Sequence, residues 1–486
     1  MPFIRYLLLS LVLLTATASA VTTLDLPNIG DSTGTLMSPE FERRLGQAFL
    51  SQVRKQAKII TDPEIETYIQ SIGYRLVSSS DNNTQLFTFF VIDDPIINAF
   101  AAPGGIVGIN SGVILNAGNE SELAAVMAHE ISHVTQKHMA RSFEKQSKMS
   151  LPMMAALLGA ILIASQNPQA GQAAMAAVQG VAAQTRINFT RSNEAESDRI
   201  GMQLLARSGF NPRGMPSFFE KLQKNSRYAG KAPEFLRTHP LTTNRIADSR
   251  ARAEAYPPDL RYNESKKFAF MQAKIVAMSE KDPRHAVDFF KQKLEDEQYG
   301  NNYAPLHYGY ALALMEAGRY RQAYNQLQEL LAEDGENTSY LLAAADLQTR
   351  QNNYQQAFRI YEQAIKLYPD YRPVVLAYTE ALLQADHPQQ ARELLKRYGK
   401  FHDQDLTYYD FLTRAEAESG NTIESGIASA EYYYLSGETR VAIQQLKYIL
   451  RQRNPKPDYF QEERLHDRIA FLEQELQIEK DLKLIK

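Results

Sequence analysis

The 486-residue sequence contains no cysteine. The chain therefore cannot form disulfide bonds, carry a lipid on a cysteine or bind a metal through thiolates. Any metal site must be built from histidine and carboxylate side chains. An excess of positive charge is also missing, because the formal net charge is −3. Nothing in this balance suggests a nucleic-acid partner.

Long apolar runs are scarce as well. The N-terminus carries Arg5, a short apolar stretch and then Ala18-Ser-Ala20. This pattern predicts a secretory signal cleaved after Ala20, because the apolar stretch is short for a membrane span. An uncleaved anchor is the alternative. The apolar segment 149–164 is also short for a span and suits a buried or interfacial position, which leaves peripheral membrane association open.

The most informative stretch is His129-Glu-Ile-Ser-His133. Asn119 and Glu122 form a capping-box pattern ahead of it, and apolar residues recur at helical spacing, so the stretch is predicted to be helical. Histidines four positions apart share one helix face and can bind one metal ion, which places Glu130 beside the open metal position. We interpret the stretch as two zinc ligands and a general base for water activated by the metal. An amphipathic helix with incidental histidines is the alternative.

A second helix is predicted from Thr190 to Ser208. It carries Glu194 and Asp198, which are four positions apart and so point the same way. A zinc site with two histidines needs a third ligand, and Glu194 supplies it. Glu196 is a competitor, but it would lie on another face if Asp198 is also in the site. A solvated acidic face is the alternative to a ligand role.

Two further histidines lie near these motifs. His138 follows the first motif but does not fit the longer metal motif, whose two remaining places hold Gln136 and Met139. His239 precedes Pro240 in a predicted loop before a helix. There it could approach the metal or a developing oxyanion.

A small sheet is predicted ahead of the metal helix. Helices are expected from Ser38 to about Gln56 and from Asp62 onward, followed by an aromatic and β-branched strand at 85–92. The stretch 98–115 predicts a hairpin or short sheet. In zinc proteases an extended substrate commonly adds to such an edge, although a purely structural hairpin is not excluded. Segments 149–164 and 169–183 predict a helical hairpin, either over the cleft or in the core.

From about Asn263 the sequence is helical and repeats every 34 residues. The recurring residues are Tyr320, Ala323 and Leu327, then Tyr354, Ala357 and Tyr361, then Pro388, Ala391 and Leu395. Gly318 and Asn352 mark turns between them. This is the period of tetratricopeptide helix pairs, so 263–486 is predicted to be an all-α solenoid that ends in a capping helix over 458–476. Many tyrosines of this half are explained as packing residues of the repeat. The clusters Tyr408-Tyr409 and Tyr432-Tyr-Tyr434 exceed what the packing period requires, because consecutive residues cannot share a face, and they predict a tyrosine-lined concave surface for peptide or protein.

The metal motifs resemble the zinc metalloprotease family of the CAAX prenyl endopeptidase and HtpX. The resemblance covers residues 38–255 and includes Asn98-Ala-Phe100, Pro103-Gly-Gly105 and Thr238-His-Pro240. It implies a mostly helical, zincin-like α+β domain over 38–258 with one Zn²⁺ per subunit. The two members named above are embedded in membranes, whereas this chain lacks convincing membrane helices.

The resemblance also implies roles for the site residues. His129, His133 and Glu194 bind zinc, and Glu130 is the catalytic base. Asp198 matches an acid of the family motif and either orients a ligand histidine or handles a proton. His239 either occupies the fourth zinc position at rest or donates to the oxyanion, and we favour the first role.

With its signal (1–20), a leader (21–37) and repeats, the whole chain resembles the β-barrel assembly-enhancing proteases of Gram-negative bacteria. That likeness implies a periplasmic protease and chaperone that assists outer-membrane β-barrel assembly and degrades misassembled barrels. The implied partners are assembling barrels, the β-barrel assembly machinery and an LptD-type barrel. The alternatives are a non-proteolytic chaperone or scaffold and a peptide-binding adaptor with a structural zinc.

Overall fold

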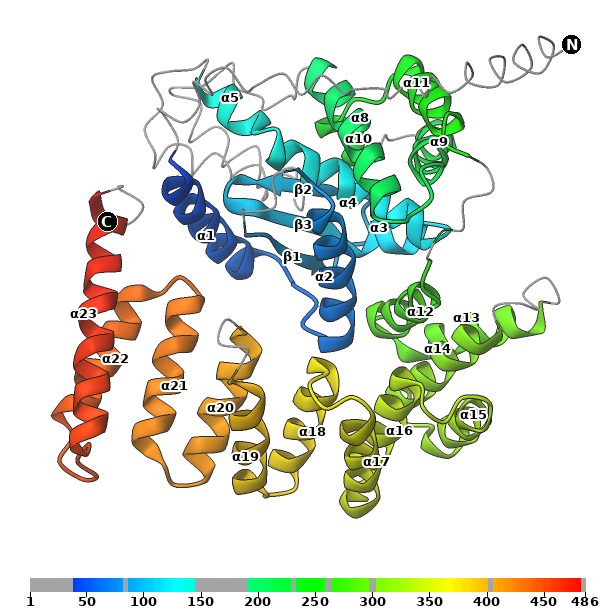
Figure 1. The fold of residues 1–486 in the computed structure, drawn as a ribbon. Helices are drawn as coiled ribbons and strands as arrows, with labels where there is room; N and C mark the ends of the chain where they lie inside the picture. The colour runs from blue at the N-terminus through cyan, green and yellow to red at the C-terminus, as the bar shows by residue number, and fades with distance from the viewer. Residues whose placement is uncertain are drawn as a thin grey trace, which may run out of the picture.

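The computed structural model describes residues 38–81, 86–144, 191–228, 233–257, 262, 264–296, 303–400 and 405–481. The predicted signal, the leader and the apolar hairpin over 149–183 lie outside these residues. The N-terminal half, residues 38–257, combines helices with a sheet, and the repeat half, residues 264–481, is all helical (Figure 1). The predicted fold class, a mostly helical α+β domain followed by an all-α repeat solenoid, is confirmed.

The N-terminal half begins with two capped helices. Its elements are α1 (Pro39–Gln56), α2 (Pro63–Ser78), β1 (Thr88–Ile92), β2 (Ala99–Ala102), the 3-10 turn η2 (Pro103–Gly105), β3 (Ile106–Asn110), α3 (Ser111–Asn116), α4 (Glu120–Thr135), α5 (His138–Glu144), α8 (Arg191–Arg207), α9 (Gly214–Tyr228), α10 (Phe235–Thr238) and α11 (Thr243–Glu254). Ser38 and Asp62 cap α1 and α2 by accepting hydrogen bonds from backbone N–H groups of the first turn.

The three strands form one mixed sheet in the order β1-β3-β2. β1 pairs with β3 in parallel, and β2 pairs with β3 as an antiparallel hairpin through η2. β2 is therefore an edge strand, and α4 packs against it. The predicted short sheet before the metal helix is present, and one of its edges lies beside that helix.

α4 is the central helix of this half, because 14 of its 16 residues are buried. Asn119 caps it by accepting from the Glu122 N–H, but the reciprocal bond of a capping box is absent, because the Glu122 carboxylate accepts from Gly118 N–H instead. The helix ends at Thr135. Lys137 has a φ of 51°, which turns the chain before α5 begins.

α8 packs closely on α4 at a glycine. A Cβ on Gly201 would lie 3.1 Å from the Ala128 carbonyl carbon and 3.1 Å from the His129 nitrogen, both backbone atoms. Only glycine allows this approach without a shift of one helix. The close packing brings the acidic face of α8 to the histidines of α4.

The repeat half contains paired helices that follow the predicted period. They are α12 (Lys267–Ser279), α13 (Pro283–Glu295), α14 (Tyr303–Glu316), α15 (Tyr320–Glu333), α16 (Thr338–Arg350), α17 (Tyr354–Leu367), α18 (Arg372–Gln384), α19 (Pro388–Tyr398), α20 (Leu406–Glu418), α21 (Thr422–Leu435), α22 (Thr439–Arg451) and α23 (Tyr459–Asp481). The second helices of three pairs begin at 320, 354 and 388, and the turns at 318, 352, 386 and 420 all have positive φ.

The repeat helices form an arc beneath the N-terminal half (Figure 1). At one end, α12 packs on α2 and α3, and the largest hydrophobic core runs without a break from the sheet into α16. At the other end, α23 lies against α1, where buried Arg44 pairs with Glu475 at 3.0 Å. The arc therefore contacts the N-terminal half at both of its ends.

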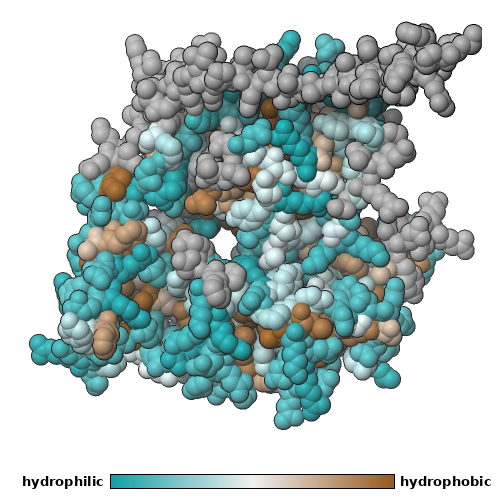
Figure 2. All heavy atoms as spheres, viewed as in Figure 1, coloured by the Kyte–Doolittle hydropathy of each residue, from teal (hydrophilic) through white to brown (hydrophobic). Residues whose placement is uncertain are grey.

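The surface in view is mainly hydrophilic, and hydrophobic residues appear in scattered patches, several of them over the repeat helices (Figure 2). Of the helices that the structure describes, none combines the length and the apolar character needed to cross a membrane. The predicted tyrosine clusters are only partly on a surface. Tyr408 is buried against Tyr398. Tyr433 and Tyr434 pack against the hydrophobic cluster that α21, α22 and α23 share. Tyr432 lines a cleft between repeat helices.

Candidate metal centre

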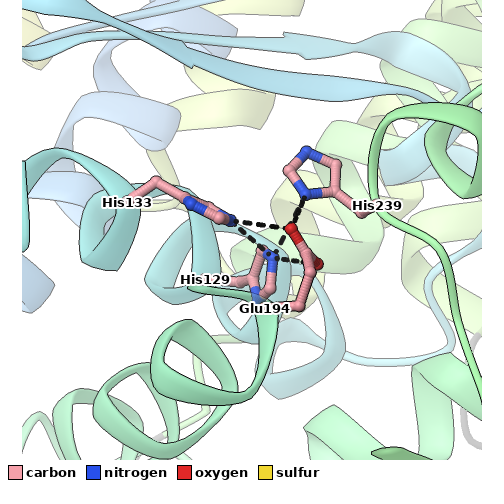
Figure 3. Close-up of side chains that lie close together, drawn as sticks. All are labelled: His129, His133, Glu194 and His239. Carbon is pink, nitrogen blue, oxygen red and sulfur yellow. Dashed lines mark hydrogen bonds and ion pairs between the residues drawn. The ribbon is translucent and has the colours of Figure 1, made fainter. Parts of the chain in front are cut away.

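Three histidines and one carboxylate converge in the N-terminal half: His129, His133, Glu194 and His239 (Figure 3). One ligand atom from each residue lies within 4.8 Å of the others, and all four residues are buried. The structure thus brings the three predicted ligands together and adds His239 to the same cluster.

Two packed helices supply the three predicted ligands. On α4, the Nε2 atoms of His129 and His133 lie 3.0 Å apart, because four positions make about one helical turn. On α8, Glu194 Oε2 lies 3.5 Å from His129 Nε2, and its Oε1 lies 3.5 Å from His133 Nε2. The close packing at Gly201 accounts for the short distance between the two helices.

His239 reaches the cluster from the segment after α10. Its backbone N–H donates to the Phe235 carbonyl at 2.8 Å, and its ring stacks on the Phe235 ring with centroids 4.7 Å apart. Nδ1 lies 3.1 Å from Glu194 Oε1 and 3.4 Å from His129 Nε2. Its Nε2 lies 3.5 Å from Glu130 Oε1. His239 therefore contacts both the ligand group and Glu130.

Glu130 is completely buried, and neither of its carboxylate oxygens has a hydrogen-bond partner among the residues described. Burial raises its pKa, while the neighbouring His239 and His129 oppose that effect. A buried carboxylate without a hydrogen bond is costly unless something else in the site satisfies it. Its place next to His129 is the one predicted for a general base.

Asp198 and Arg245 contact the predicted ligands His129 and Glu194. Asp198 Oδ1 lies 3.0 Å from His129 Nδ1, and Arg245 of α11 donates to both Asp198 oxygens at 2.7 and 2.8 Å. Arg245 also lies 2.8 Å from Glu194 Oε2 and donates to the Pro240 carbonyl at 2.8 Å. Burial raises the pKa of Asp198, but His129 and Arg245 outweigh it, so that the pKa is lowered.

Arg245 is not among the site residues predicted from the sequence, although the sequence contains a signal for it. Two carboxylates on one buried helix face require a compensating cation, and Arg245 is the positive residue in the stretch directly after His239. His138 and Glu196 are not predicted ligands. Neither belongs to the ligand cluster, but His138 Nδ1 lies 2.8 Å from His133 Nδ1, and its Nε2 lies 2.9 Å from Glu196 Oε2.

The two histidines of α4 differ in their proton affinity. Burial disfavours the charged form of His129, but Asp198 and Glu194 raise its pKa to about 10. Burial and the charge of His129 lower the pKa of His133 well below its usual range. Glu194 and Asp198 therefore place negative charge beside the histidine nitrogens, where a bound metal ion would replace the proton, because ligand histidines must be neutral.

The donor set fits a zinc ion. It consists of imidazole nitrogens and a carboxylate, without sulfur, and zinc sites of hydrolases use this combination. Glu130, buried beside the ligands without a hydrogen bond, has the place of a group that interacts with water at such a metal. The residues present therefore fit the metal that the sequence predicted.

Comparison with known proteins gives the family. Residues 63–253 match the model of peptidase family M48, and residues 348–415 match a tetratricopeptide repeat model. The β-barrel assembly-enhancing protease of Escherichia coli strain K12 is 39% identical over 421 residues, which cover 86% of this chain and 85% of that protein. The chain belongs to peptidase family M48. This M48 peptidase is thus a metalloprotease with tetratricopeptide repeats, as predicted.

Two other relatives differ in how much of this chain they match. The β-barrel assembly-enhancing protease of Yersinia pestis is 37% identical over 86% of each chain. The mitochondrial metalloendopeptidase OMA1 of Schizosaccharomyces pombe is 28% identical over 43% of this chain and 60% of that protein. The family match spans the residues of the metal cluster, from His129 to His239.

Proposed function

We propose that this M48 peptidase is a zinc-dependent endopeptidase of the Gram-negative periplasm that acts during the assembly of outer-membrane β-barrel proteins. One observation carries the proposal of zinc chemistry: a buried cluster of three imidazoles and one carboxylate lies next to Glu130, a buried carboxylate without a hydrogen-bond partner in the described part of the chain. The names of the bacterial relatives support the role in barrel assembly.

The proposed mechanism assigns a task to each side chain. A bound Zn²⁺ supplies Lewis-acid chemistry that activates water and polarises a peptide carbonyl. His129, His133 and Glu194 hold it, and Asp198 orients His129 through the 3.0 Å contact to Nδ1. Glu130 takes the proton of the attacking water and passes it to the leaving amine. Its raised pKa suits a group that must both accept and release a proton.

Substrate binding is assigned to the edge strand β2. Within the described sheet, β2 pairs on one side only, with β3, and α4 packs beside it. An extended chain added to the free edge would run past the metal cluster. A small cavity of about 30 Å³, lined by Ala101, Ala102, His133 and Met139 among others, lies between this strand and the end of α4. It would take a small side chain.

His239 is proposed as the resting fourth ligand. Its Nδ1 lies 3.1 Å from Glu194 Oε1 and 3.4 Å from His129 Nε2, so the lone pair of this nitrogen would be directed at a metal that those two residues bind. Its segment is short and tied by Arg245 to the carboxylates. A client that displaces His239 would open the site. The rival role is donation to the oxyanion.

The repeat half is proposed to bind protein partners. A cleft of about 600 Å³ is lined by the first helices of successive repeats, α12, α14, α16, α18 and α20, together with the start of α2. Because the cleft includes residues of both halves, a partner bound there would be held near the peptidase half. The proposed partners are assembling or misassembled barrels, the β-barrel assembly machinery and an LptD-type barrel. Toward these barrels the peptidase is proposed to act as a chaperone and to degrade those that fail to assemble.

A second candidate is a non-proteolytic chaperone or scaffold that uses the repeats alone. The two candidates are separated by expressing Glu130→Gln in the periplasm, crosslinking, and identifying the trapped proteins. A peptidase should accumulate barrel proteins that the wild type cleaves. A scaffold should trap the same proteins with either form and cleave none of them.

A further inference from the structure

His138 is a completely buried histidine that the proposed mechanism does not use. Its Nδ1 lies 2.8 Å from His133 Nδ1, and its Nε2 lies 2.9 Å from Glu196 Oε2. Arg141 approaches the same Glu196 oxygen at 3.5 Å. A row of polar groups therefore runs from the metal cluster through His138 to a partly exposed carboxylate.

The turn after α4 creates this arrangement. In a continuous helix, a residue five positions after His133 would lie about 140° around the axis and could not face it. Lys137, with a φ of 51°, ends the helix and lets His138 fold back over its last turn. Glu196 is two positions from Glu194 and so faces another side of α8, the side that His138 occupies.

The hydrogen positions along the row follow from the role of His133. Its Nε2 faces Glu194 and His129, so a metal in the cluster takes the lone pair of that nitrogen. A neutral imidazole then carries its hydrogen on Nδ1. His133 Nδ1–H must donate to His138 Nδ1, which leaves the His138 hydrogen on Nε2, where it donates to Glu196.

We propose that His138 and Glu196 are positioning residues, which hold the His133 ring in the orientation and tautomer that present Nε2 to the metal. The inference rests on the proposed function, because it takes His133 as a metal ligand. Asp198 does the same for His129 by direct contact, at 3.0 Å. The second ligand is thus supported by a carboxylate acting through an intervening histidine.

Ser197 offers a competing partner. Its hydroxyl lies 3.3 Å from His138 Nδ1, which is longer than the 2.8 Å contact from His133. One lone pair accepts one good hydrogen bond, so the shorter contact takes precedence. Removal of the hydroxyl by Ser197→Ala should therefore leave metal binding unchanged.

The test uses a matched pair of substitutions in the full-length protein. Asparagine places its side-chain oxygen near the position of a histidine Nδ1, whereas glutamine places its oxygen near the position of Nε2. His138→Asn therefore keeps an acceptor for His133, and His138→Gln does not. Zinc affinity is measured by competition with a chelator, together with the absorption spectrum of the Co²⁺-loaded protein and the melting temperature without metal. Exposed His285, on α13, provides the control His285→Asn.

We expect His138→Gln to weaken zinc binding by about ten- to a hundred-fold and to alter the Co²⁺ spectrum, while His138→Asn stays close to the wild type. Glu196→Ala should shift affinity in the same direction as His138→Gln. Equal zinc affinities of the Asn and Gln variants, at any level, would overturn the proposal, because the Nδ1 contact would then not matter. A wild-type protein that binds no zinc would overturn the proposed function and this inference with it.

Discussion

Where paired helices pack in the repeat half, small apolar residues recur at the period of the repeat: Ala323, Ala357 and Ala391 are all completely buried. Where α4 and α8 pack in the N-terminal half, Gly201 allows the same close approach, but the neighbouring buried side chains are His129, Glu194 and Asp198. Both contacts depend on a small residue. The difference shows that the repeat packing serves stability, whereas the packing of α4 on α8 assembles a charged site.

The largest expected effect is a loss of proteolysis when the site between α4 and α8 is changed at Glu130. Glu130→Gln should reduce proteolysis by about 10²- to 10⁴-fold, because the amide cannot accept the proton of water. Zinc content and melting temperature should remain those of the wild type, since Glu130 is not among the proposed ligands. Digestion of an unfolded protein is measured beside zinc content.

The exposed substitution Glu220→Gln on α9 controls for the loss of one negative charge. Cleavage by Glu130→Gln at the wild-type rate would remove Glu130 from the mechanism. Zinc lost together with activity would instead make it a ligand.

His239→Ala comes next, because it distinguishes a resting zinc ligand from a donor to the oxyanion. If His239 blocks the metal at rest, its removal should raise cleavage, including cleavage of the enzyme itself. If it donates to the oxyanion, cleavage should fall, by about ten- to a thousand-fold. We expect the increase. A variant equal to the wild type in zinc content and rate would place His239 outside the reaction.

A paired substitution compares the two helix contacts directly. Gly201→Ala should push α8 from the α4 backbone and weaken zinc binding, whereas Ala357→Leu should leave zinc binding unchanged. Overpacking of this kind costs about 1–3 kcal/mol of unfolding free energy, so both variants should melt earlier. Chelator competition and thermal melting are measured on both. Zinc binding lost to the same extent in both variants would contradict the comparison.

The smallest effect on partner binding is expected when the repeat half is separated, although this divides the core that runs from the sheet into α16. A fragment of residues 263–486 should fold alone, because each repeat packs on its neighbours, and should retain partner binding. It should melt below the full-length protein, since α12 loses its contacts with α2 and α3. Circular dichroism and pull-down of partners test this. An unfolded fragment, or a folded one without partners, would count against a recognition role for the repeats.

Periodic features of the fold were predictable from the sequence. The 34-residue period places helix starts at 320, 354 and 388, and Asn352 adopts the positive φ expected at a turn. The helix starts were equally predictable, because Ser38 and Asp62 accept hydrogen bonds from N–H groups in the first turn of the helix that each precedes. The histidines and acids four positions apart are brought together by two helices whose patterns were clear.

Contacts that depend on a break in the pattern were not predictable. Lys137 is an ordinary helix former, yet it adopts a positive φ and turns His138 toward His133. Arg245 reaches Asp198 from a third helix, and no local spacing connects the two. The continuous core from the sheet into α16 likewise depends on residues far apart in the sequence. The change to an all-helical pattern at about residue 263 gives no sign of it.

The cluster of His129, His133, Glu194 and His239 is proposed to hold a catalytic zinc. The most direct measurement is the zinc content of the purified protein, with cleavage of an unfolded substrate followed in the same sample before and after chelation. If the cluster holds a catalytic zinc, the protein should contain one zinc per chain, cleavage should stop when the metal is removed, and activity should recover when zinc is restored. Undiminished cleavage by the zinc-free protein would contradict the proposal.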